Sequence, residues 1–329
     1  MSRPIIITGA AGFIGRNVVA ALNARGCTNL ILVDLLGTDD KWRNLRGLEF
    51  EELVSPEKFL ALAEAQRAPR PDAVIHLGAC SATTERNADF LLENNTHYTR
   101  RLCEWTLGHN ARFVYASSAA TYGDGAQGYR DAEDGLTALR PLNMYGQSKH
   151  LFDLWARRHG LFNRIVGLKY FNVFGPFEDH KADMRSLVHK AYGQILSRGW
   201  LELFESDRPD YAHGEQKRDF IYVQDAVEVT LHFTDHRDTG GLFNCGTGQA
   251  RTWLDLARAL FAAMGRKPDI RFIPLPPALR GKYQYFTQAD TAKLRDVGGY
   301  SRPFTSLEEG VRDYVLTHLQ HTGDGALPS

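Results

Sequence analysis

The chain has 329 residues, 43% of them hydrophobic and 24% charged, which is the composition of a globular protein with one large domain or two smaller ones. Lysine and arginine number 39, as do aspartate and glutamate, so the formal net charge is zero. A neutral chain gives no support for binding to nucleic acid or to a membrane surface through bulk charge. No run approaches the roughly 20 apolar residues that span a bilayer, and the short apolar run at the N-terminus is expected to be a strand, not a signal peptide.

The cysteines favour a reducing environment. They are scattered and form no CxxC pair: Cys27, Cys80, Cys103 and Cys245. We therefore expect reduced thiols in a cytoplasmic protein. The 12 histidines show no metal-ligand spacing, so no metal site is expected.

Short β-branched runs alternate with helical stretches in the first half of the chain. Strands are predicted at 4–8, 30–34, 73–77, 112–116 and 164–170, and helices at 13–25, 56–66, 94–109 and 145–159. This alternation predicts an α/β protein with a Rossmann-type, doubly wound parallel sheet. Beyond residue 172 the pattern loosens. We expect a dinucleotide-binding domain over 1–171 and a smaller α/β substrate-binding domain over 172–329, with some segments of the latter returning to the first sheet.

A glycine turn follows the first predicted strand. Gly9, Gly12 and Gly15 have the spacing GxxGxxG and stand where that strand meets a helix. Glycines let the backbone turn sharply and approach a pyrophosphate, whose charge the N–H groups of the helix N-terminus stabilise. The second strand ends in Asp34, about 20 residues later, where a carboxylate can accept hydrogen bonds from the adenosine ribose. These features predict a dinucleotide site.

The residues alone leave the choice between NAD and NADP open. Asp34 favours NAD because a carboxylate repels a ribose 2′-phosphate, whereas Lys41 and Arg43 follow closely and can neutralise that phosphate.

The candidate reacting groups are Tyr145 and Lys149, which lie four residues apart on one face at the start of a predicted helix. A tyrosine titrates near pH 10, so it needs a nearby cation to act as a base near neutrality. Ser117 and Ser118 follow the strand at 112–116, at the edge of a parallel sheet where ligands bind. A hydroxyl there can hydrogen-bond a substrate alcohol or carbonyl that undergoes hydride transfer.

Longer stretches carry a family resemblance. The glycine turn, Ser118 and the Tyr145–Lys149 pair resemble the extended short-chain dehydrogenase/reductase superfamily. More narrowly, the chain resembles the ADP-L-glycero-D-manno-heptose 6-epimerase family in the segments 76–85, 115–123, 170–176, 217–223 and 283–290, and in the adjacent His180 and Lys181.

The resemblance implies oxidation of the heptose at its sixth carbon by tightly held NADP, reorientation of the intermediate, and return of the hydride to the opposite face. Tyr145 and Lys181 then serve as acid/base groups on two sides of the carbonyl, with Ser118 between them and Lys149 supporting Tyr145. It also implies a homo-oligomer, five subunits being one option, and a product used for the lipopolysaccharide core.

The resemblance further implies two sets of contacts. The cofactor site comprises Gly9, Gly12, Phe13, Ile14, Gly15, Asp34, Leu35, Lys41, Leu77, Gly78, Ala79, Cys80, Ser81, Asn94, Lys149 and Val173. The substrate site comprises Ser118, Asn172, Asp183, Lys190, Phe204, Glu205, Arg218 and Tyr283. Four features depart from the family pattern: Leu35, Leu77, Asp183 and a longer stretch at 207–216.

Three alternatives stay open. A 4,6-dehydratase needs an acid and a base beside the serine, but Ala119, Ala120 and Thr121 follow Ser118. A sugar 4-epimerase shares every motif up to Lys181. A non-catalytic dinucleotide-binding protein has no need to keep Ser118, Tyr145 and Lys149 together.

Overall fold

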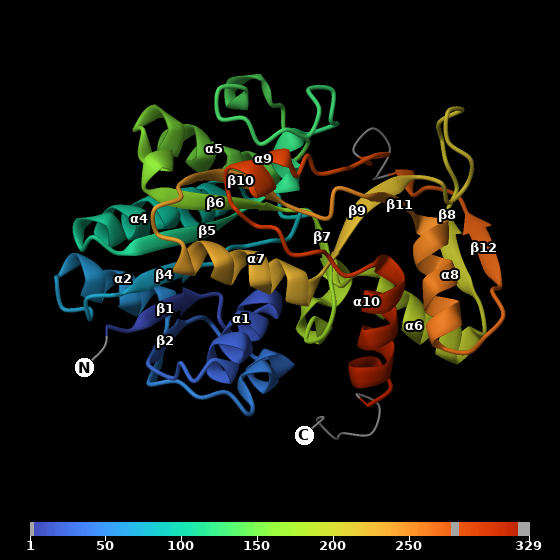
Figure 1. Ribbon diagram of the computed structural model, residues 1–329. Helices are drawn as coiled ribbons and strands as arrows, with labels where there is room; N and C mark the ends of the chain where they lie inside the picture. Colours follow the sequence, from blue (N-terminus) through green and yellow to red (C-terminus); the bar gives the residue numbers. More distant parts are fainter. Residues whose placement is uncertain (1–2, 278–282, 322–329) are drawn as a thin grey trace.

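The computed structural model describes residues 3–277 and 283–321. Its centre is a seven-stranded parallel sheet with the strand order β10-β6-β5-β4-β1-β2-β3 (Figure 1). The strands are β1 (Ile5–Thr8), β2 (Leu30–Val33), β3 (Glu52–Val54), β4 (Ala73–His76), β5 (Arg112–Ser118), β6 (Ile165–Tyr170) and β10 (Gly241–Cys245). The five predicted strands and the Rossmann-type fold are confirmed, whereas β3 and β10 were not predicted.

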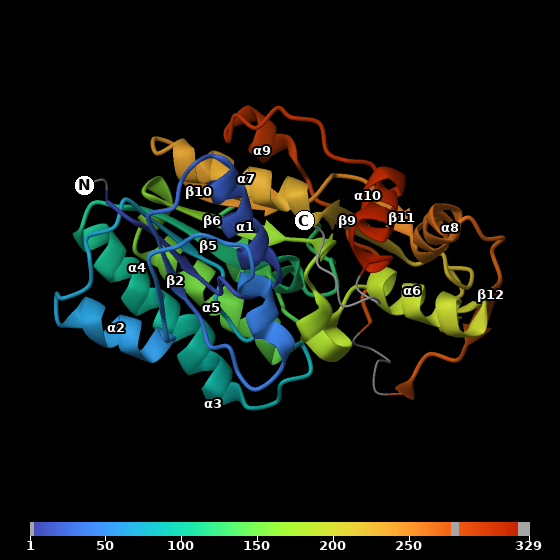
Figure 2. The ribbon, with the colours of Figure 1, turned by 90° about the horizontal axis from the view of Figure 1, so that it is seen from below.

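Helices cover both faces of this sheet (Figure 2). One face carries α1 (Phe13–Ala24) and α7 (Val223–Asp235), which pack against each other. The other carries α2 (Pro56–Glu64), α4 (Tyr98–Gly108) and α5 (Met144–Arg158). Since the sheet is covered on both sides, strands such as β2, β4 and β6 are buried along their whole length and consist mostly of apolar residues.

The helix predicted at 94–109 differs from the structure. The helical segment starts earlier, at α3 (Ala88–Leu91), and passes through a π-helical turn, η2 (Leu92–His97), before α4 begins. In this turn Asn95 donates to the carbonyl of Cys80 at 2.9 Å and to the hydroxyl of Ser148 at 2.9 Å. π-Helical turns often occur at functional sites. Here the turn connects the loop after β4 to α5, a long-range contact that periodicity does not reveal.

The second half of the chain forms a smaller unit at one side of the large sheet. It contains a three-stranded sheet, a two-stranded sheet and packed helices (Figure 1). The strands are β7 (Asn172–Phe174), β8 (Leu201–Phe204), β9 (Lys217–Tyr222), β11 (Ala250–Thr252) and β12 (Ile270–Ile273); the helices are α6 (Leu187–Arg198), α8 (Trp253–Ala263) and α10 (Leu307–Tyr314). The short helix α9 (Ala292–Asp296) comes from the same half of the chain but packs against β10 of the large sheet. Because α7 and β10 of this half pack on the large sheet, the division at residue 172 stays a prediction about folding units.

Short helical turns complete the described chain: η1 (Asp40–Leu45), η3 (Ala119–Tyr122), η4 (Leu136–Ala138), η5 (Leu161–Asn163), η6 (Asp179–Met184) and η8 (Val315–Leu319). Across residues 3–277 and 283–321, no helix has the length and apolarity needed to cross a membrane. Nor does that part of the chain gather three or more metal-ligating side chains at one place.

Candidate active site

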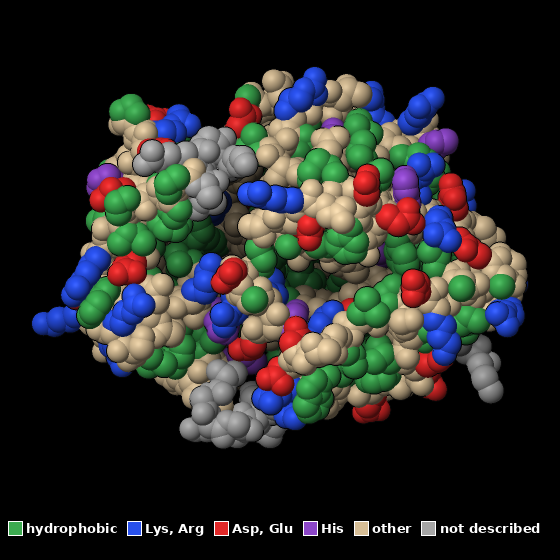
Figure 3. Space-filling view, turned by 180° about the vertical axis from the view of Figure 1, so that it is seen from behind, with side chains coloured by type: hydrophobic (Ala, Val, Ile, Leu, Met, Phe, Trp, Pro, Cys, Tyr) green, Lys and Arg blue, Asp and Glu red, His purple; other side chains and the backbone are tan. Residues whose placement is uncertain are grey.

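A cavity of about 820 Å³ lies between the carboxyl ends of the central strands and the smaller unit. Its walls come from the ends of β1, β2, β4, β5 and β6 and from η6, α6 and α8. A hollow with Lys and Arg side chains near its rim is visible on the face shown in Figure 3. The strand order reverses at β1, and the crevice at such a point is where doubly wound sheets bind ligands.

The glycine turn forms a narrow cradle at one end of this cavity. A Cβ on Gly15 would lie 2.0 Å from the Gly9 carbonyl oxygen, and one on Gly9, whose φ is +68°, would lie 2.7 Å from the Gly78 nitrogen. No described side chain caps the N-terminus of α1, and its first turn holds no acidic residue. The N–H groups there are thus left for an anion. The cradle fits the pyrophosphate of a dinucleotide.

Gly15→Ala should damage this cradle because the added methyl group collides with backbone. We expect a loss of about 1–3 kcal/mol in the free energy of unfolding and a large loss of dinucleotide affinity. Urea denaturation and fluorescence titration with the reduced dinucleotide measure the two effects. Gly108→Ala is the matched control, since a Cβ there meets nothing within 4 Å. If Gly15→Ala bound the dinucleotide with unchanged affinity, the assignment of this turn to the cofactor site would be wrong.

Asp34 lies at the end of the cavity nearest the glycine turn, and its carboxylate already has partners. One oxygen accepts from the Ala11 N–H at 2.8 Å. The other accepts from the Leu35 N–H at 2.7 Å and from Lys41 Nζ at 2.6 Å. Lys41 therefore neutralises the carboxylate and adds a cation where the adenosine ribose is expected to bind.

The expected reacting groups meet at the start of α5. Asn143 caps this helix by accepting from the Gly146 N–H at 2.8 Å. A Cβ on Gly146 would lie 2.8 Å from the Ala120 carbonyl oxygen, so this glycine lets α5 approach the turn that follows β5. The Ser118 hydroxyl consequently hydrogen-bonds the Tyr145 phenol oxygen. Such a pair can hold one substrate oxygen and exchange a proton with it.

Burial dominates the electrostatics of this pair. It raises the pKa of Tyr145, while the hydrogen bond from Ser118 opposes the rise. Burial also lowers the pKa of Lys149 to about 8, although the nearby Asp153 carboxylate raises it. Lys149 Nζ donates to the Ala116 carbonyl at 2.9 Å. The depressed pKa expected for Tyr145 from the sequence is therefore wrong for this structure, in which burial raises that pKa and Lys149 is not among the groups that shift it.

Lys181 enters the same cavity from η6. Its ammonium lies 4.9 Å from the centre of the Phe13 ring, beside the glycine turn. Burial lowers the pKa of Lys181, and the Glu178 carboxylate, whose oxygen lies 3.9 Å from Lys181 Nζ, opposes this. A lysine that is partly desolvated in this way is a suitable proton-transfer group.

Two acidic residues hold the η6 loop in place, and sequence reasoning missed both. Glu178 is fully buried and accepts from the Ser186 N–H at 2.6 Å and from its hydroxyl at 2.5 Å. Asp179 binds His189 at 2.9 Å and His318 at 3.3 Å. These contacts tie the loop to α6 and to the C-terminal η8. No local pattern indicates them, because His318 lies far away in the sequence.

The cavity brings together most of the residues expected at the site: Gly9, Gly12, Phe13, Ile14, Gly15, Asp34, Lys41, Leu77, Gly78, Ala79, Cys80, Ser81, Ser118, Tyr145, Lys149, Asn172, Val173, Lys181, Lys190, Phe204 and Tyr283. His180, which the sequence marks as part of the family resemblance, also lines it. So do Arg185, Phe220, Trp253 and Leu256, which sequence reasoning did not name as site residues. Trp253 and Leu256 stand at the start of α8, where helical periodicity predicts only a core face.

Five expected residues do not line the cavity. Leu35 points outward and is 63% exposed, and Asp183 is also exposed. The Asn94 side chain donates to the Asn95 side chain at 3.0 Å within the π-helical turn. Glu205 is half-buried, and its N–H donates to the Ile273 carbonyl at 2.8 Å.

Arg218, the fifth, lies buried behind the cavity wall. Its guanidinium carbon is 5.1 Å from the Tyr283 ring centre and 5.6 Å from the Trp253 ring centre. Both rings face the cavity.

Comparison with known proteins places this geometry in a family. The model of the NAD dependent epimerase/dehydratase family matches residues 5–246. An ADP-L-glycero-D-manno-heptose-6-epimerase of Nitratidesulfovibrio vulgaris is 52% identical over 315 residues, which cover 95% of this chain and 97% of that one.

Solved structures agree with this placement. The crystal structure of the Helicobacter pylori ADP-L-glycero-D-manno-heptose-6-epimerase is 27% identical, covers 95% of each chain and superposes with a TM-score of 0.78. A UDP-glucose 4-epimerase of Thermotoga maritima is 26% identical, covers 98% of this chain and all of its own, and has a TM-score of 0.80. The TM-scores of 0.78 and 0.80 do not separate the two reactions. The 52% identity to the Nitratidesulfovibrio vulgaris enzyme does. The chain belongs to the NAD dependent epimerase/dehydratase family and, within it, to the ADP-L-glycero-D-manno-heptose-6-epimerases.

Proposed function

We propose that this chain converts ADP-D-glycero-D-manno-heptose to ADP-L-glycero-D-manno-heptose by transient oxidation at the sixth carbon with bound NADP. The product would supply heptose for the lipopolysaccharide core. The observation that carries the proposal is that two separate proton-transfer groups, the Ser118–Tyr145 pair and Lys181, enter one cavity beside the glycine turn. An epimerase needs acid/base groups that serve both faces of a planar carbonyl.

The cofactor, when bound, accepts and returns a hydride. Tyr145 takes the hydroxyl proton during oxidation in one configuration, and Ser118 holds the same oxygen through a hydrogen bond. Lys149 supplies positive charge that favours the phenolate. Lys181 performs the proton transfer for the other configuration, after the sugar carbonyl has turned. Bringing a cation close to Tyr145 offsets the rise that burial causes in its pKa.

The preference for NADP rests on Lys41. Its ammonium neutralises Asp34 and can also form a charged hydrogen bond with a 2′-phosphate. Lys41→Ala should weaken NADP binding by about 10- to 100-fold, as expected for a charge-assisted contact, and should affect NAD much less. Titration of both dinucleotides measures this. Arg43→Ala is the matched control, because Arg43 pairs with Asp40 instead. Equal losses for both dinucleotides in Lys41→Ala would contradict the preference.

The remaining proposals concern substrate, assembly and place in the cell. Lys190, Asn172, Phe204 and Tyr283 line the cavity beyond the reacting groups and are proposed to hold the nucleotide sugar, with Arg218 behind Tyr283 available for the diphosphate. We further propose a cytoplasmic homo-oligomer, five subunits being one option.

One incubation tests the reaction. The purified protein is mixed with ADP-D-glycero-D-manno-heptose, and proton NMR follows the sugar. We expect inversion at the sixth carbon only. Parallel incubation with UDP-glucose tests 4-epimerisation, and loss of water would reveal a dehydratase. Inversion at the fourth carbon, or no turnover of the heptose, would overturn the proposal. Extraction and chromatography of any copurifying nucleotide separates NADP from NAD.

A further inference from the structure

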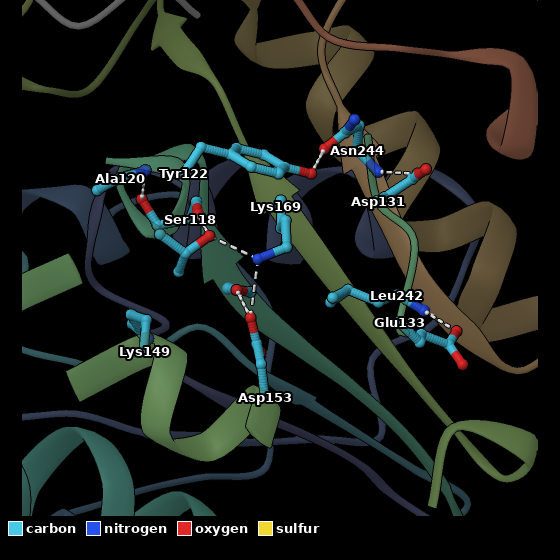
Figure 4. A network of polar contacts seen from close by, with 12 residues as sticks. Ser118, Ala120, Tyr122, Asp131, Glu133, Lys149, Asp153, Lys169, Leu242 and Asn244 are labelled. Carbon is cyan, nitrogen blue, oxygen red and sulfur yellow. Dashed lines mark hydrogen bonds and ion pairs between the residues drawn. The ribbon is translucent and has the colours of Figure 1, made fainter. Parts of the chain in front are cut away.

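A buried ion pair lies directly beneath the serine end of β5. Lys169 on β6 and Asp153 on α5 are both fully inaccessible to solvent, and Lys169 Nζ lies 3.0 Å from an Asp153 carboxylate oxygen (Figure 4). Neither residue lines the cavity. The pair therefore does not contact substrate or cofactor, and its effect on the reaction has to pass through neighbouring residues.

Asp153 binds two residues on β5. One carboxylate oxygen accepts from the Tyr115 hydroxyl at 2.7 Å. The other accepts from the Ser117 hydroxyl at 2.7 Å as well as from Lys169. The carboxylate thereby fixes α5, which carries Tyr145 and Lys149, to the strand that ends in the reacting serine.

Lys169 reaches the other side of that serine. Its ammonium donates to the Thr121 hydroxyl at 2.5 Å, and this hydroxyl donates in turn to the Ser118 carbonyl at 2.7 Å. The ammonium also lies 4.9 Å from the centre of the Tyr122 ring. Ser118 is consequently held on both sides, through Ser117 by Asp153 and through Thr121 by Lys169.

Stability alone gives little reason to bury two charges here. A buried ion pair is often no more stabilising than a well-packed apolar pair of similar volume, because each charge has lost its hydration. What this pair supplies beyond packing is directional hydrogen bonds to residues on either side of Ser118. Charged hydrogen bonds are the stronger ones and fix geometry more firmly than apolar contacts do.

We propose that Asp153 and Lys169 are positioning residues that hold Ser118 against Tyr145 and place a negative charge one helical turn from Lys149. This inference rests on the roles proposed above for those three residues. Asp153 follows Lys149 at the spacing i, i+4, where side chains on a helix are neighbours.

Lys149 has few other charged or titratable neighbours. Cys80 faces it from the loop after β4, and His76 faces it from β4 itself. His76 is fully buried and stays neutral, since its pKa is lowered to about 3. Asp153 is thus the anion that keeps Lys149 protonated against the effect of burial, and among these groups its influence on the pKa of Lys149 is second only to that burial.

Three variants test the proposal: Asp153→Asn, Lys169→Met and the double variant that carries both changes. The single variants leave an unpaired buried charge and are expected to melt earlier. The double variant has no unpaired charge and should recover thermal stability. We expect kcat for epimerisation to stay at least about 10-fold below that of the parent in the double variant, as displacement of reacting groups predicts, with KM little changed.

The pH dependence of kcat distinguishes an electrostatic role of Asp153 from a packing role, because a loss of packing alone would not shift it. Without the Asp153 charge the pKa of Lys149 falls further, so the alkaline limb of kcat should shift down by about one pH unit in Asp153→Asn. The shift should keep this direction and be smaller in the double variant, which also loses the Lys169 cation. The pair Glu133 and Lys293, joined at 2.8 Å near the surface, is the matched control. Its double variant, Glu133→Gln with Lys293→Met, should keep both kcat and the pH profile of the parent.

A second titration requires no sugar. NMR of ¹³C-methylated protein reports the pKa of Lys149 directly and should show it lowered in Asp153→Asn. If the parent fails to epimerise the heptose, the proposed function is wrong, and this titration still tests the electrostatic role of Asp153. If the double variant folds with the parent's kcat and pH profile, or if the Lys149 titration is unchanged, the positioning proposal is overturned.

Discussion

Tyr145→Phe is expected to lower kcat for epimerisation by about 10³-fold, within the range that a positioned acid/base group contributes. The variant removes the phenol oxygen that hydrogen-bonds Ser118 and leaves the ring in place. Affinity for the dinucleotide should stay near that of the parent, because the glycine turn and the Asp34–Lys41 pair are untouched. NMR of the sugar product and fluorescence titration of the dinucleotide measure the two quantities.

A matched control is available elsewhere in the chain. Tyr98 is half-buried, and its hydroxyl donates to the Pro56 carbonyl at 3.3 Å, outside the cavity. Tyr98→Phe should therefore keep kcat within about twofold, since substitutions away from the reacting groups and other special features are usually mild. If Tyr145→Phe retained a rate close to that of the parent, the assignment of Tyr145 as an acid/base group would be wrong.

Lys181→Met is expected to lower kcat for epimerisation by about 10²- to 10³-fold and to leave an enzyme that can oxidise only one of the two epimers. The variant removes the ammonium that lies 4.9 Å from the centre of the Phe13 ring and keeps an unbranched side chain of similar length. Tyr145 should still serve one configuration at the sixth carbon. One epimer of the sugar should therefore still reduce the bound dinucleotide in a single turnover, and the other should not. Absorbance of the reduced dinucleotide reports this directly.

Lys58→Met serves as the control, because Lys58 is exposed on α2 and lies away from the cavity. It should behave like the parent with both epimers. Equal loss of dinucleotide reduction from both epimers in Lys181→Met would mean that Lys181 contributes to binding and not to one half of the proton transfer. Full epimerisation in the same variant would contradict a mechanism in which Tyr145 and Lys181 each serve one configuration.

Features that depend on neighbours in the sequence could be predicted from it. Each of the five predicted strands carries its own run of apolar residues that are mostly β-branched, aromatic or aliphatic, and the glycine turn carries its own spacing. The order of these elements also predicts that Ser118 and Tyr145 meet, since strand ends of a parallel sheet share one edge. The fold class and the reacting groups follow from patterns of this local kind.

Features that depend on contacts between distant segments could not be predicted. Asp153 reads as an ordinary polar position in a helix, and Lys169 breaks an otherwise apolar strand without indicating a partner. The strand β10 has no pattern that shows it will lie beside β6, because edge pairing is decided by packing. Glu178 resembles a solvated loop charge until the fold buries it.

Two of the expected cofactor contacts, Leu35 and Asn94, also depend on local geometry that the sequence does not show. Leu35 follows Asp34 directly and its backbone N–H donates to the Asp34 carboxylate, but its side chain is exposed. Asn94 binds its neighbour Asn95 inside the π-helical turn. Neither asparagine lines the cavity, and sequence spacing cannot resolve how the π-helical turn orients the two side chains.

The most direct test of transient oxidation uses ADP-D-glycero-D-manno-heptose that carries deuterium at the sixth carbon. If the hydrogen leaves as hydride and returns from the same enclosed site, the inverted product keeps its deuterium, and a reaction run in D₂O with unlabelled sugar places none there. NMR of the product at that carbon gives both answers. Loss of deuterium to solvent during inversion would show that the carbon is deprotonated instead, and would contradict an oxidation and reduction at the cavity that Tyr145, Lys149 and Lys181 share.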